Sequence, residues 1–273
     1  MDRNYIVIIV ILGTFFMSAC TEPSPSISEE ELIVVWAYLY AGEPVDDIRL
    51  TSTQPLDADS TAPPPINDAI ITLIRDGHRY ECELASGDSG YYKYSGSDLL
   101  IEEGDLFSLE IDYGGKLTTA TTLVPGAPIS LTLSASTMTV PDFSDRQAFR
   151  EWRESENRQI VVSWENTDNS WYYVTLLNIE PNPIPFDSFF SGRAREFIFP
   201  PINDNTYSIR LPLIEHLGQH RVNVYKVNEE YVDLYESRDQ DTRDLNEPLT
   251  NIKNGLGVFA AFNSASVILN VVQ

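Results

Sequence analysis

The segment AIITLIRDGHRYECELA, residues 69–85, constrains the fold more than any other part of the sequence. Its two apolar stretches meet at Asp76-Gly77, a pair suited to the positive φ angles of a two-residue hairpin turn. After the turn, Tyr80 and Cys82 alternate with acidic residues, and alternation with a period of two places such side chains on one face of a strand. The segment therefore predicts a β-hairpin with a buried face.

Strand-forming segments recur on both sides of this hairpin. They are LIVVWAYLY (32–40), DDIRLTSTQ (46–54), GYYKY (90–94) and DLFSLEIDYGGKLTTATTLV (105–124). β-branched and aromatic residues, which strands prefer, dominate them, and turns rich in Gly and Pro separate them. Short strands with regular turns are typical of a β-sandwich. We therefore expect an N-terminal immunoglobulin-like sandwich over residues 32–127.

A second set of segments predicts a C-terminal sandwich over residues 128–273, similar to a fibronectin type III domain. Its strands are expected within 159–180, 206–213, 219–227 and 265–272. The intervening stretch at 144–159 is polar and has few strand formers, so we expect a loop or a short helix there. The predicted fold class is all-β, with two sandwich domains and a short inserted helix.

The segment NEEYVDLYESRDQDTRD, residues 228–244, has a helical pattern. Asn228 is suited to cap the helix, and acidic residues follow it in the first turn. Tyr231 and Leu234 are three residues apart, which places both on one helical face. We therefore expect this segment to provide the inserted helix.

The first thirty residues predict export and lipid attachment. Residues 5–16 form an apolar run of about a dozen residues, too short for a membrane span of roughly 20 but typical of a signal peptide. The following Met17-Ser18-Ala19-Cys20 resembles a bacterial lipobox, in which the Cys thiol is acylated and becomes the new N-terminus. We therefore expect a lipoprotein signal peptide over residues 1–19 and a lipid on Cys20. A plain signal peptide or a short anchor is the alternative.

The residues after the expected cleavage site form a tether. TEPSPSISEEE is rich in Pro, Ser and acidic residues, so we expect residues 20–31 to be extended and flexible. The chain has two Cys residues, and lipid on Cys20 leaves Cys82 without a disulfide partner. We expect Cys82 to be a small buried hydrophobe rather than a reactive thiol, because no positive group is evident to lower its pKa.

The charge balance argues against a nucleic-acid-binding protein. Eighteen Lys and Arg residues face 41 Asp and Glu residues, a formal net charge of −23, and such a chain repels phosphate backbones. The acidity indicates solubility and low non-specific adhesion. Weak calcium binding is the alternative, although no segment has the ordered oxygen ligands of a calcium loop.

Catalytic and metal motifs are absent from the sequence. His78 falls on the expected hairpin turn. His216 and His220 are four residues apart, a spacing that could bind zinc on a helix, but Gly218 and the strand that follows favour turn residues. There is no nucleophile elbow, phosphate loop or dinucleotide fingerprint. Two carboxylates could flank a glycosidic bond, but among so many acidic residues no sequence spacing identifies such a pair. We therefore expect no enzyme activity, cofactor or metal.

Aromatic residues are the candidate ligand contacts. The candidates for stacking on a sugar are Trp152, Trp164, Trp171, Tyr172 and Tyr173. We expect Trp164 to be a core residue of its strand, and Trp171, after the loop NTDNS, is the best candidate for a surface position. The Pro-rich loop at 181–201 contains Phe186, Phe189 and Phe190. A long loop of this kind predicts either a partner contact or a flap over the sandwich edge.

The segment NGLGVF near the C-terminus carries Gly255 and Gly257, which permit a positive φ or a close backbone approach. It predicts a tight turn into the last strand, or else a ligand-facing loop. Together with the lipobox and the hairpin region, the tail from 228 to 272 resembles a family of Bacteroidetes lipoproteins, domain of unknown function 4249. The first half also resembles the regulatory sandwich domains of carboxypeptidases.

This resemblance implies an outer-membrane lipoprotein beside a TonB-dependent receptor, and it carries over no catalytic residue. We therefore expect a protein anchored to the membrane by its N-terminal lipid, acting as a non-enzymatic accessory in nutrient uptake. The acidic residues 28–31 resemble a surface-export signal, so exposure at the cell surface is expected. The alternatives are a stand-alone carbohydrate-binding or adhesive module and, after that, a hydrolase.

Overall fold

The computed structural model describes residues 32–54, 62–155, 159–186, 196–210, 213–238 and 250–273. The chain divides into a unit of residues Met1–Glu31 and a compact unit of residues Leu32–Gln273, and only the second is described below. The expected signal peptide, Cys20 and the tether therefore lie outside the described residues, as do Phe189 and Phe190.

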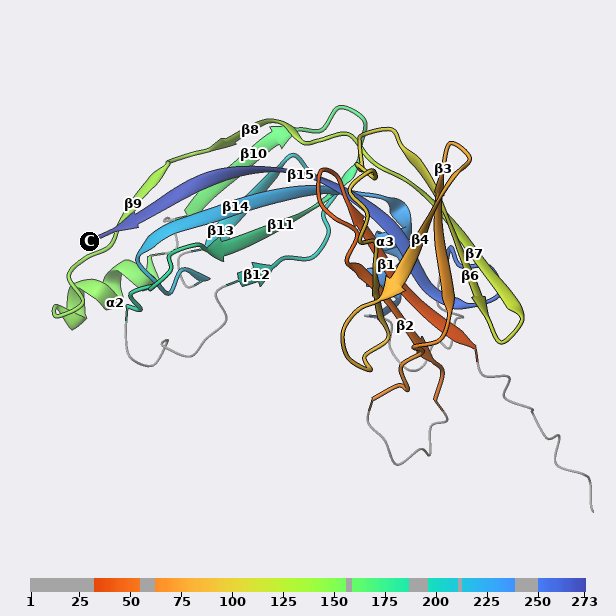
Figure 1. Ribbon diagram of the computed structural model, residues 1–273. Coiled ribbons are helices and arrows are strands. Elements are labelled where there is room, and N and C mark those ends of the chain that lie inside the picture. The colour runs from red at the N-terminus through yellow and green to blue at the C-terminus, as the bar shows by residue number, and fades with distance from the viewer. Residues whose placement is uncertain (1–31, 55–61, 156–158, 187–195, 211–212, 239–249) are drawn as a thin grey trace, which may run out of the picture. The chain divides into compact units, whose positions relative to one another are not determined.

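Most of the described chain is β-structure, which confirms the all-β expectation (Figure 1). A large mixed sheet has twelve strands. Along the sheet their order is β12 (Glu196–Ile198), β11 (Trp171–Asn178), β14 (Gly218–Val227), β15 (Leu256–Val272), β1 (Ile33–Tyr40), β2 (Asp47–Ser52), β5 (Tyr91–Lys93), β4 (His78–Leu84), β3 (Ile70–Arg75), β6 (Leu106–Tyr113) and β7 (Lys116–Leu123), with β9 (Thr137–Thr139) pairing with β15.

A small sheet and two short helices complete the described fold. The small sheet contains β13 (Thr206–Arg210), β10 (Gln159–Glu165) and β8 (Ile129–Leu133) in that order. The helices are α2 (Arg146–Glu154) and α3 (Glu229–Arg238), so both helical expectations are confirmed. Asp145 caps α2 by accepting a hydrogen bond from the backbone nitrogen of Ala148. Within the described residues, neither helix is long and apolar enough to cross a membrane.

The expected Asp-Gly hairpin is formed by β3 and β4. Arg75 pairs with His78 across a two-residue turn, and Asp76 and Gly77 have φ angles of 50° and 78°. These two positive angles are those that a type I′ turn requires. The local sequence was therefore sufficient to specify this element.

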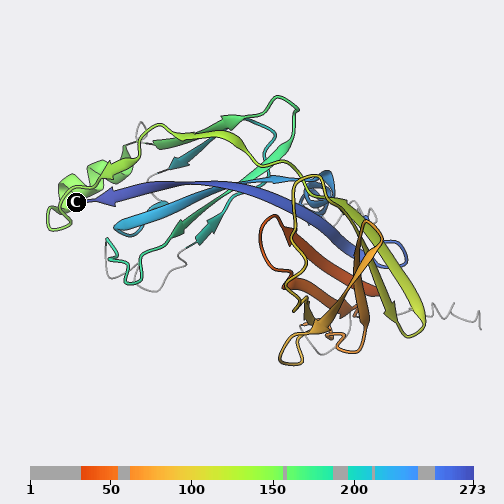
Figure 2. The same ribbon diagram turned by 45° about the horizontal axis from the view of Figure 1, so that its top comes forward.

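Strand β15, dark blue in Figures 1 and 2, links the two halves of the described chain. It pairs in parallel with β1 and antiparallel with β14. The sequence predicted a closing strand at 265–272, but the strand begins at Leu256. The expected tight turn precedes it, with Asn254 at a φ of 61°. Gly257 has a φ of 102°, and a Cβ there would lie 1.9 Å from the Val35 carbonyl oxygen, so glycine permits the close approach to β1.

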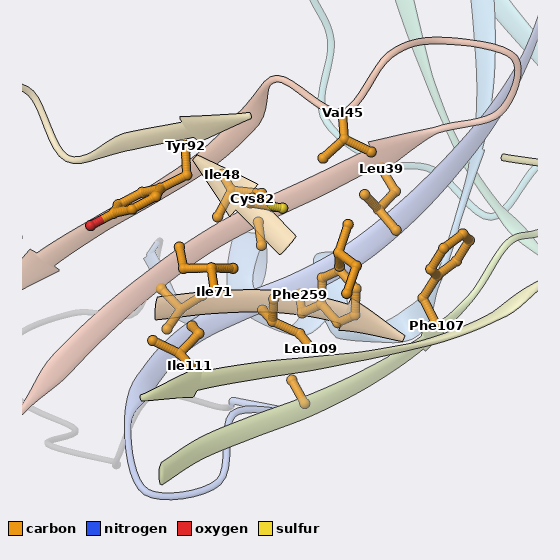
Figure 3. Packing of buried hydrophobic residues seen from close by; sticks show 14 of the residues in the cluster. Leu39, Val45, Ile48, Ile71, Cys82, Tyr92, Phe107, Leu109, Ile111 and Phe259 are labelled. Carbon is orange, nitrogen blue, oxygen red and sulfur yellow. The ribbon is translucent and has the colours of Figure 1, made fainter. Parts of the chain in front are cut away.

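Buried side chains form three clusters, which we call the N-core, the C-core and the tyrosine cluster. The N-core packs residues of the first half against Phe259 and Ala261 of β15 (Figure 3). The C-core packs residues of the second half against Leu269 and Val271 of the same strand. The tyrosine cluster packs α3 against the opposite face of the large sheet, with Phe262 of β15 among its buried members.

The N-core confirms the interpretation of Cys82, whose sulfur lies among aliphatic side chains in Figure 3. The residue is 6% exposed. Burial raises the pKa of its thiol to about 12, and the charge of Glu81 acts in the same direction. The thiol is therefore protonated at neutral pH and packs as a small apolar group.

Candidate functional site

Of the five aromatic residues considered as a sugar platform, Trp171 alone is not buried. The other four, Trp152, Trp164, Tyr172 and Tyr173, are each less than 9% exposed. Trp164 packs in the C-core, as expected. Trp171 is the first residue of β11, and its side chain lies on the face opposite to that of Tyr172. The sheet thus holds the indole beside the loop that precedes the strand.

A cleft of about 500 Å³ opens at Trp171. Its walls come from the loop before β11, the end of β14 and the first turn of α3. Besides the indole, the polar lining consists of four carboxylates, two amides and a hydroxyl, from Asp168, Glu229, Glu230, Asp233, Asn169, Asn228 and Ser170. An aromatic surface with several hydrogen-bonding groups is typical of a small-molecule site.

Side-chain hydrogen bonds fix the loop on one side of the cleft. Asn166 donates to the Ser170 carbonyl oxygen at 3.0 Å and accepts from the Ser170 backbone nitrogen at 2.9 Å. Asn203 donates to the carbonyl oxygen of Asn169 at 2.7 Å, and Asn169 has a φ of 56°. Asn is one of the few residues that adopt this left-handed conformation readily. The Asn/Asp-rich sequence therefore specifies an ordered loop.

Asn228 fixes the other side of the cleft, at the start of α3. Its side-chain amide donates to Thr122 Oγ1 at 3.0 Å and to the Leu123 carbonyl oxygen at 2.8 Å. The carbonyl oxygen of Asn228 accepts from the backbone nitrogen of Tyr231 at 3.2 Å. The sequence suggested a capping side chain here. The structure shows the amide joining the helix start to β7.

The carboxylates of the cleft differ in their electrostatic surroundings. Lys226 Nζ lies 2.5 Å from Asp168 Oδ2, and this hydrogen bond lowers the pKa of that carboxyl. Burial raises the pKa of Glu230, and the charges of Glu229 and Asp233 raise it further. The helix side of the cleft therefore brings three carboxyl groups close together. The carboxylates and amides of such a cleft can accept hydrogen bonds from a hydroxyl-rich ligand. The sugar ring or apolar face of that ligand can contact the indole.

Phe186, expected as a ligand or partner contact, lies in the C-core and is 4% exposed. Its ring centroid is 5.3 Å from that of Phe143, 5.8 Å from that of Phe149 and 6.0 Å from that of Trp152. These contacts hold α2 on the core. The structure thus gives Phe186 a packing role, because a ring enclosed on these sides has little surface left for a ligand.

His78 and His220 occupy different environments. His78 is exposed on the hairpin, as expected. The interpretation of His220 as a turn residue is wrong, because it lies within β14 and is buried. The Asn178 amide nitrogen is 3.2 Å from its Nε2, and the Gly218 carbonyl oxygen is 3.2 Å from its Nδ1. Burial lowers the His220 pKa to about 4. The described residues contain no group of three or more His, Cys, Asp or Glu placed to hold a metal ion.

The structure contains a second hollow that was not predicted from the sequence. Its polar and aromatic lining comes from Tyr38, Tyr40, Asp47, Tyr173, Tyr231 and Phe262. These residues lie on five different elements, so no local pattern brings them together. The one available signal was LIVVWAYLY, in which aromatic residues occupy the face of β1 opposite to Ala37 and Leu39.

A family model described as "Domain of unknown function (DUF4249)" matches residues 21–268. The chain belongs to the DUF4249 family. The match covers nearly all of the described fold and both hollows, and it confirms the resemblance inferred from the sequence. Among curated proteins, this DUF4249 protein has no match.

Two solved structures show a distant likeness to this DUF4249 protein. One is titled "Crystal structure of CBD12 from CALX1.2", with 11% sequence identity and a TM-score of 0.22 over 88% of this chain and 99% of that chain. The other is titled "Structural insight into host cell surface retention of a 1.5-MDa bacterial ice-binding adhesin". It shares 12% identity and a TM-score of 0.22 over 89% of this chain and 65% of that chain. At these scores the likeness carries no argument about function.

Proposed function

We propose that this DUF4249 protein is a non-enzymatic binding protein, anchored by lipid to the outer membrane, that assists a TonB-dependent receptor in nutrient uptake. The Trp171 cleft is its ligand site. The observation that carries the binding role is the cleft itself, where an accessible indole faces carboxylates and amides on elements fixed by hydrogen bonds. The lipobox that ends in Cys20 supports the anchor.

The ligand class follows from the lining. Sugars present an apolar ring face and a rim of hydroxyl donors, which match an indole beside carboxylate and amide acceptors. The loop at 166–170 and the start of α3 are ordered by their own hydrogen bonds. A preorganised site loses less conformational entropy when it binds. A carbohydrate fragment of one or two sugar units suits a cleft of about 500 Å³.

We also propose a finer description of the fold, with two sandwich-like halves that share β15. The first would be immunoglobulin-like, of the type found in carboxypeptidase regulatory domains, and the second fibronectin-III-like with inserted helices. The separation of the N-core from the C-core supports this division. The contribution of β15 to both cores means that the halves share a structural element.

A pull-down experiment tests the accessory role. Outer membranes carrying the wild type or Cys20→Ala are crosslinked and solubilised in detergent, and the co-purifying proteins are identified. We expect a large β-barrel transporter with the wild type and its loss with the variant, because the lipid holds the protein beside its partner. A membrane-bound wild type that recovers no transporter would contradict the accessory role.

Glycan binding tests the cleft. The detergent-solubilised wild type is screened on a glycan array, and the best ligand is titrated by calorimetry. Trp171→Ala is expected to weaken binding by about tenfold, since loss of an aromatic contact removes on the order of 1 kcal/mol or more. Tyr91→Ala is the matched control, because Tyr91 is an exposed aromatic on β5 that lies outside the cleft lining. Equal affinities for the two variants would contradict the cleft assignment.

A stand-alone carbohydrate-binding or adhesive module is the second candidate. It would use the same Trp171 cleft as its binding site. Glycan binding without a recovered transporter would support this function.

The hydrolase alternative has one supporting observation. Asp168 and Glu230, in the same cleft, have pKa values shifted in opposite directions, as an acid and a nucleophile of a glycosidase require. In a hydrolase, Glu230→Gln would abolish glycan cleavage while binding persists. We expect no cleavage by the wild type.

A further inference from the structure

The tyrosine cluster encloses a pocket of about 140 Å³ that is separate from the Trp171 cleft. Five aromatic rings, one aliphatic side chain and one carboxylate line it: Tyr38, Tyr40, Tyr173, Tyr231, Phe262, Ile198 and Asp47. The volume is close to that of an engineered cavity that holds one benzene molecule, about 150 Å³. The pocket can therefore take a single compact group but no extended chain.

The strands of the large sheet fix the positions of these side chains. Tyr38 and Tyr40 alternate along β1 with residues that enter the N-core. Tyr40 pairs with Phe262 on β15, and Tyr38 pairs with Asp47 on β2. Residues paired directly across two strands point to the same face of a sheet. The register thus places the rings and the carboxylate on one face.

The rings pack around Phe262 at different angles. The ring of Tyr231 is 5.0 Å away at 85°, and that of Tyr173 is 5.9 Å away at 83°. The ring of Tyr40 lies 5.1 Å from Phe262 and nearly parallel to it, at 21°. Together with Tyr38 these rings line the pocket from four elements, and we call this arrangement the box. Aromatic faces are electronegative, and such boxes bind quaternary ammonium groups.

Asp47 adds a negative charge to the same pocket. Its carboxylate is half-buried, and the phenol oxygen of Tyr40 lies 3.5 Å from Oδ2. The ion pairs recorded among the described residues do not include Asp47. Burial raises the pKa of this carboxyl, and neighbouring Asp46 adds to the effect. Partial desolvation of a carboxylate is costly, and a bound cation would offset this cost.

We propose that this tyrosine pocket binds a compact organic cation, the ammonium head group of a small molecule, between the aromatic rings and the Asp47 carboxylate. A weakly hydrated organic cation suits aromatic faces and one carboxylate, whereas Ca²⁺ requires six to eight oxygen ligands. The net charge of −23 favours the approach of cations over anions. The proposal does not depend on the function of the Trp171 cleft.

Choline and its neutral isostere 3,3-dimethylbutan-1-ol test the proposal. Each is titrated by NMR or calorimetry into detergent-solubilised, lipid-anchored protein. We expect choline to bind about tenfold more tightly than the isostere, since the two have the same shape and differ in charge. Equal binding would overturn the proposal in favour of a purely apolar pocket, and no binding of choline at millimolar concentration would overturn it outright.

Two variants locate the binding. Asp47→Asn keeps the size of the side chain and removes its charge, so we expect about a tenfold loss of choline affinity. Tyr231→Leu removes a wall of the box and should have a similar effect. Tyr91→Ala, on β5 and outside the pocket lining, should leave choline affinity unchanged. Thermal unfolding confirms that each variant is folded. Unchanged affinity in folded Asp47→Asn would overturn the proposal, whether or not Tyr231→Leu folds.

Discussion

The two faces of β15 serve different purposes. On one face, Phe259, Leu269 and Val271 enter the two buried cores, the N-core and the C-core. On the other face, Phe262 joins the tyrosine cluster beside a pocket, and residues further along, such as Ile268, are exposed. Alternation along one strand thus places its two faces in different surroundings. Substitutions on the first face should change the free energy of unfolding, and those at the aromatic face should chiefly change binding.

The largest expected effect is at Gly257, where β15 lies against β1. Gly257→Val would place Cβ 1.9 Å from a backbone oxygen that cannot move alone. We expect a loss of about 4 kcal/mol or more in the free energy of unfolding, measured in urea. Gly87→Val is the control, because Gly87 has a similar φ of 99° with no atom within 4 Å of a Cβ, and it should lose about 1–2 kcal/mol. Equal losses would show that close approach is unimportant.

Two adjacent residues of β15 provide a sharper test of the two faces. Leu269 is fully buried and Ile268 is 36% exposed. Leu269→Ala should lower the free energy of unfolding by about 3–4 kcal/mol, as in other aliphatic cores. Ile268→Ala should lower it by less than about 1 kcal/mol. Chemical denaturation of both variants measures the difference, and similar values would refute the division of faces.

His220 pairs with Leu269 and brings a titratable group into the core face of β14. Its pKa is lowered from 6.5 to about 4, so the unfolded chain takes up a proton at a higher pH than the folded chain. Its stabilising contribution is present above pH 6.5 and decreases as the pH falls to about 4, by about 3 kcal/mol in total.

Unfolding measured between pH 7 and pH 4 tests this effect. His220→Gln should remove this part of the pH dependence, while His78→Gln, on the exposed hairpin turn, should retain it. A His220→Gln curve parallel to that of the wild type would contradict the assignment.

The smallest expected effect is at the ion pair between Asp168 and Lys226 beside the Trp171 cleft. The Asp168 side chain is 55% exposed, and exposed pairs contribute about 0–1 kcal/mol. Lys226→Met should therefore lower stability by less than about 1 kcal/mol. It should also raise the Asp168 pKa, because the ammonium group that lowers it is lost. NMR titration of the Asp168 carboxyl in the wild type and the variant measures this change.

Local features of this fold could be predicted from the sequence. Asp76-Gly77 specified its hairpin, and the spacing of Tyr231 and Leu234 specified α3. Trp171, the best surface candidate of the sequence, is partly buried and packs against the tyrosine cluster. These predictions depend on neighbours within a few residues, where propensity and turn chemistry act directly.

The non-local features could not be predicted. The first seven residues of β15 are nearly all buried on both faces, so the alternation that marks a strand is lost there. Its partner β1 lies more than 200 residues earlier in the chain. The tyrosine pocket has the same origin, because its rings meet only after this pairing forms. β12, within the expected loop at 181–201, is three residues long and gives no periodic signal.

The parallel pairing of β1 with β15 also has a consequence for biosynthesis. A ribosome or a secretion channel delivers β1 first and β15 last. Phe259 and Ala261 belong to the N-core, so the first half cannot complete its interior while the rest of the chain is still emerging. One side of β1 lacks its partner during that time, and an unpaired strand can associate with other chains. The first half therefore completes its packing only after β15 has been delivered, and such long-range contacts form slowly during folding.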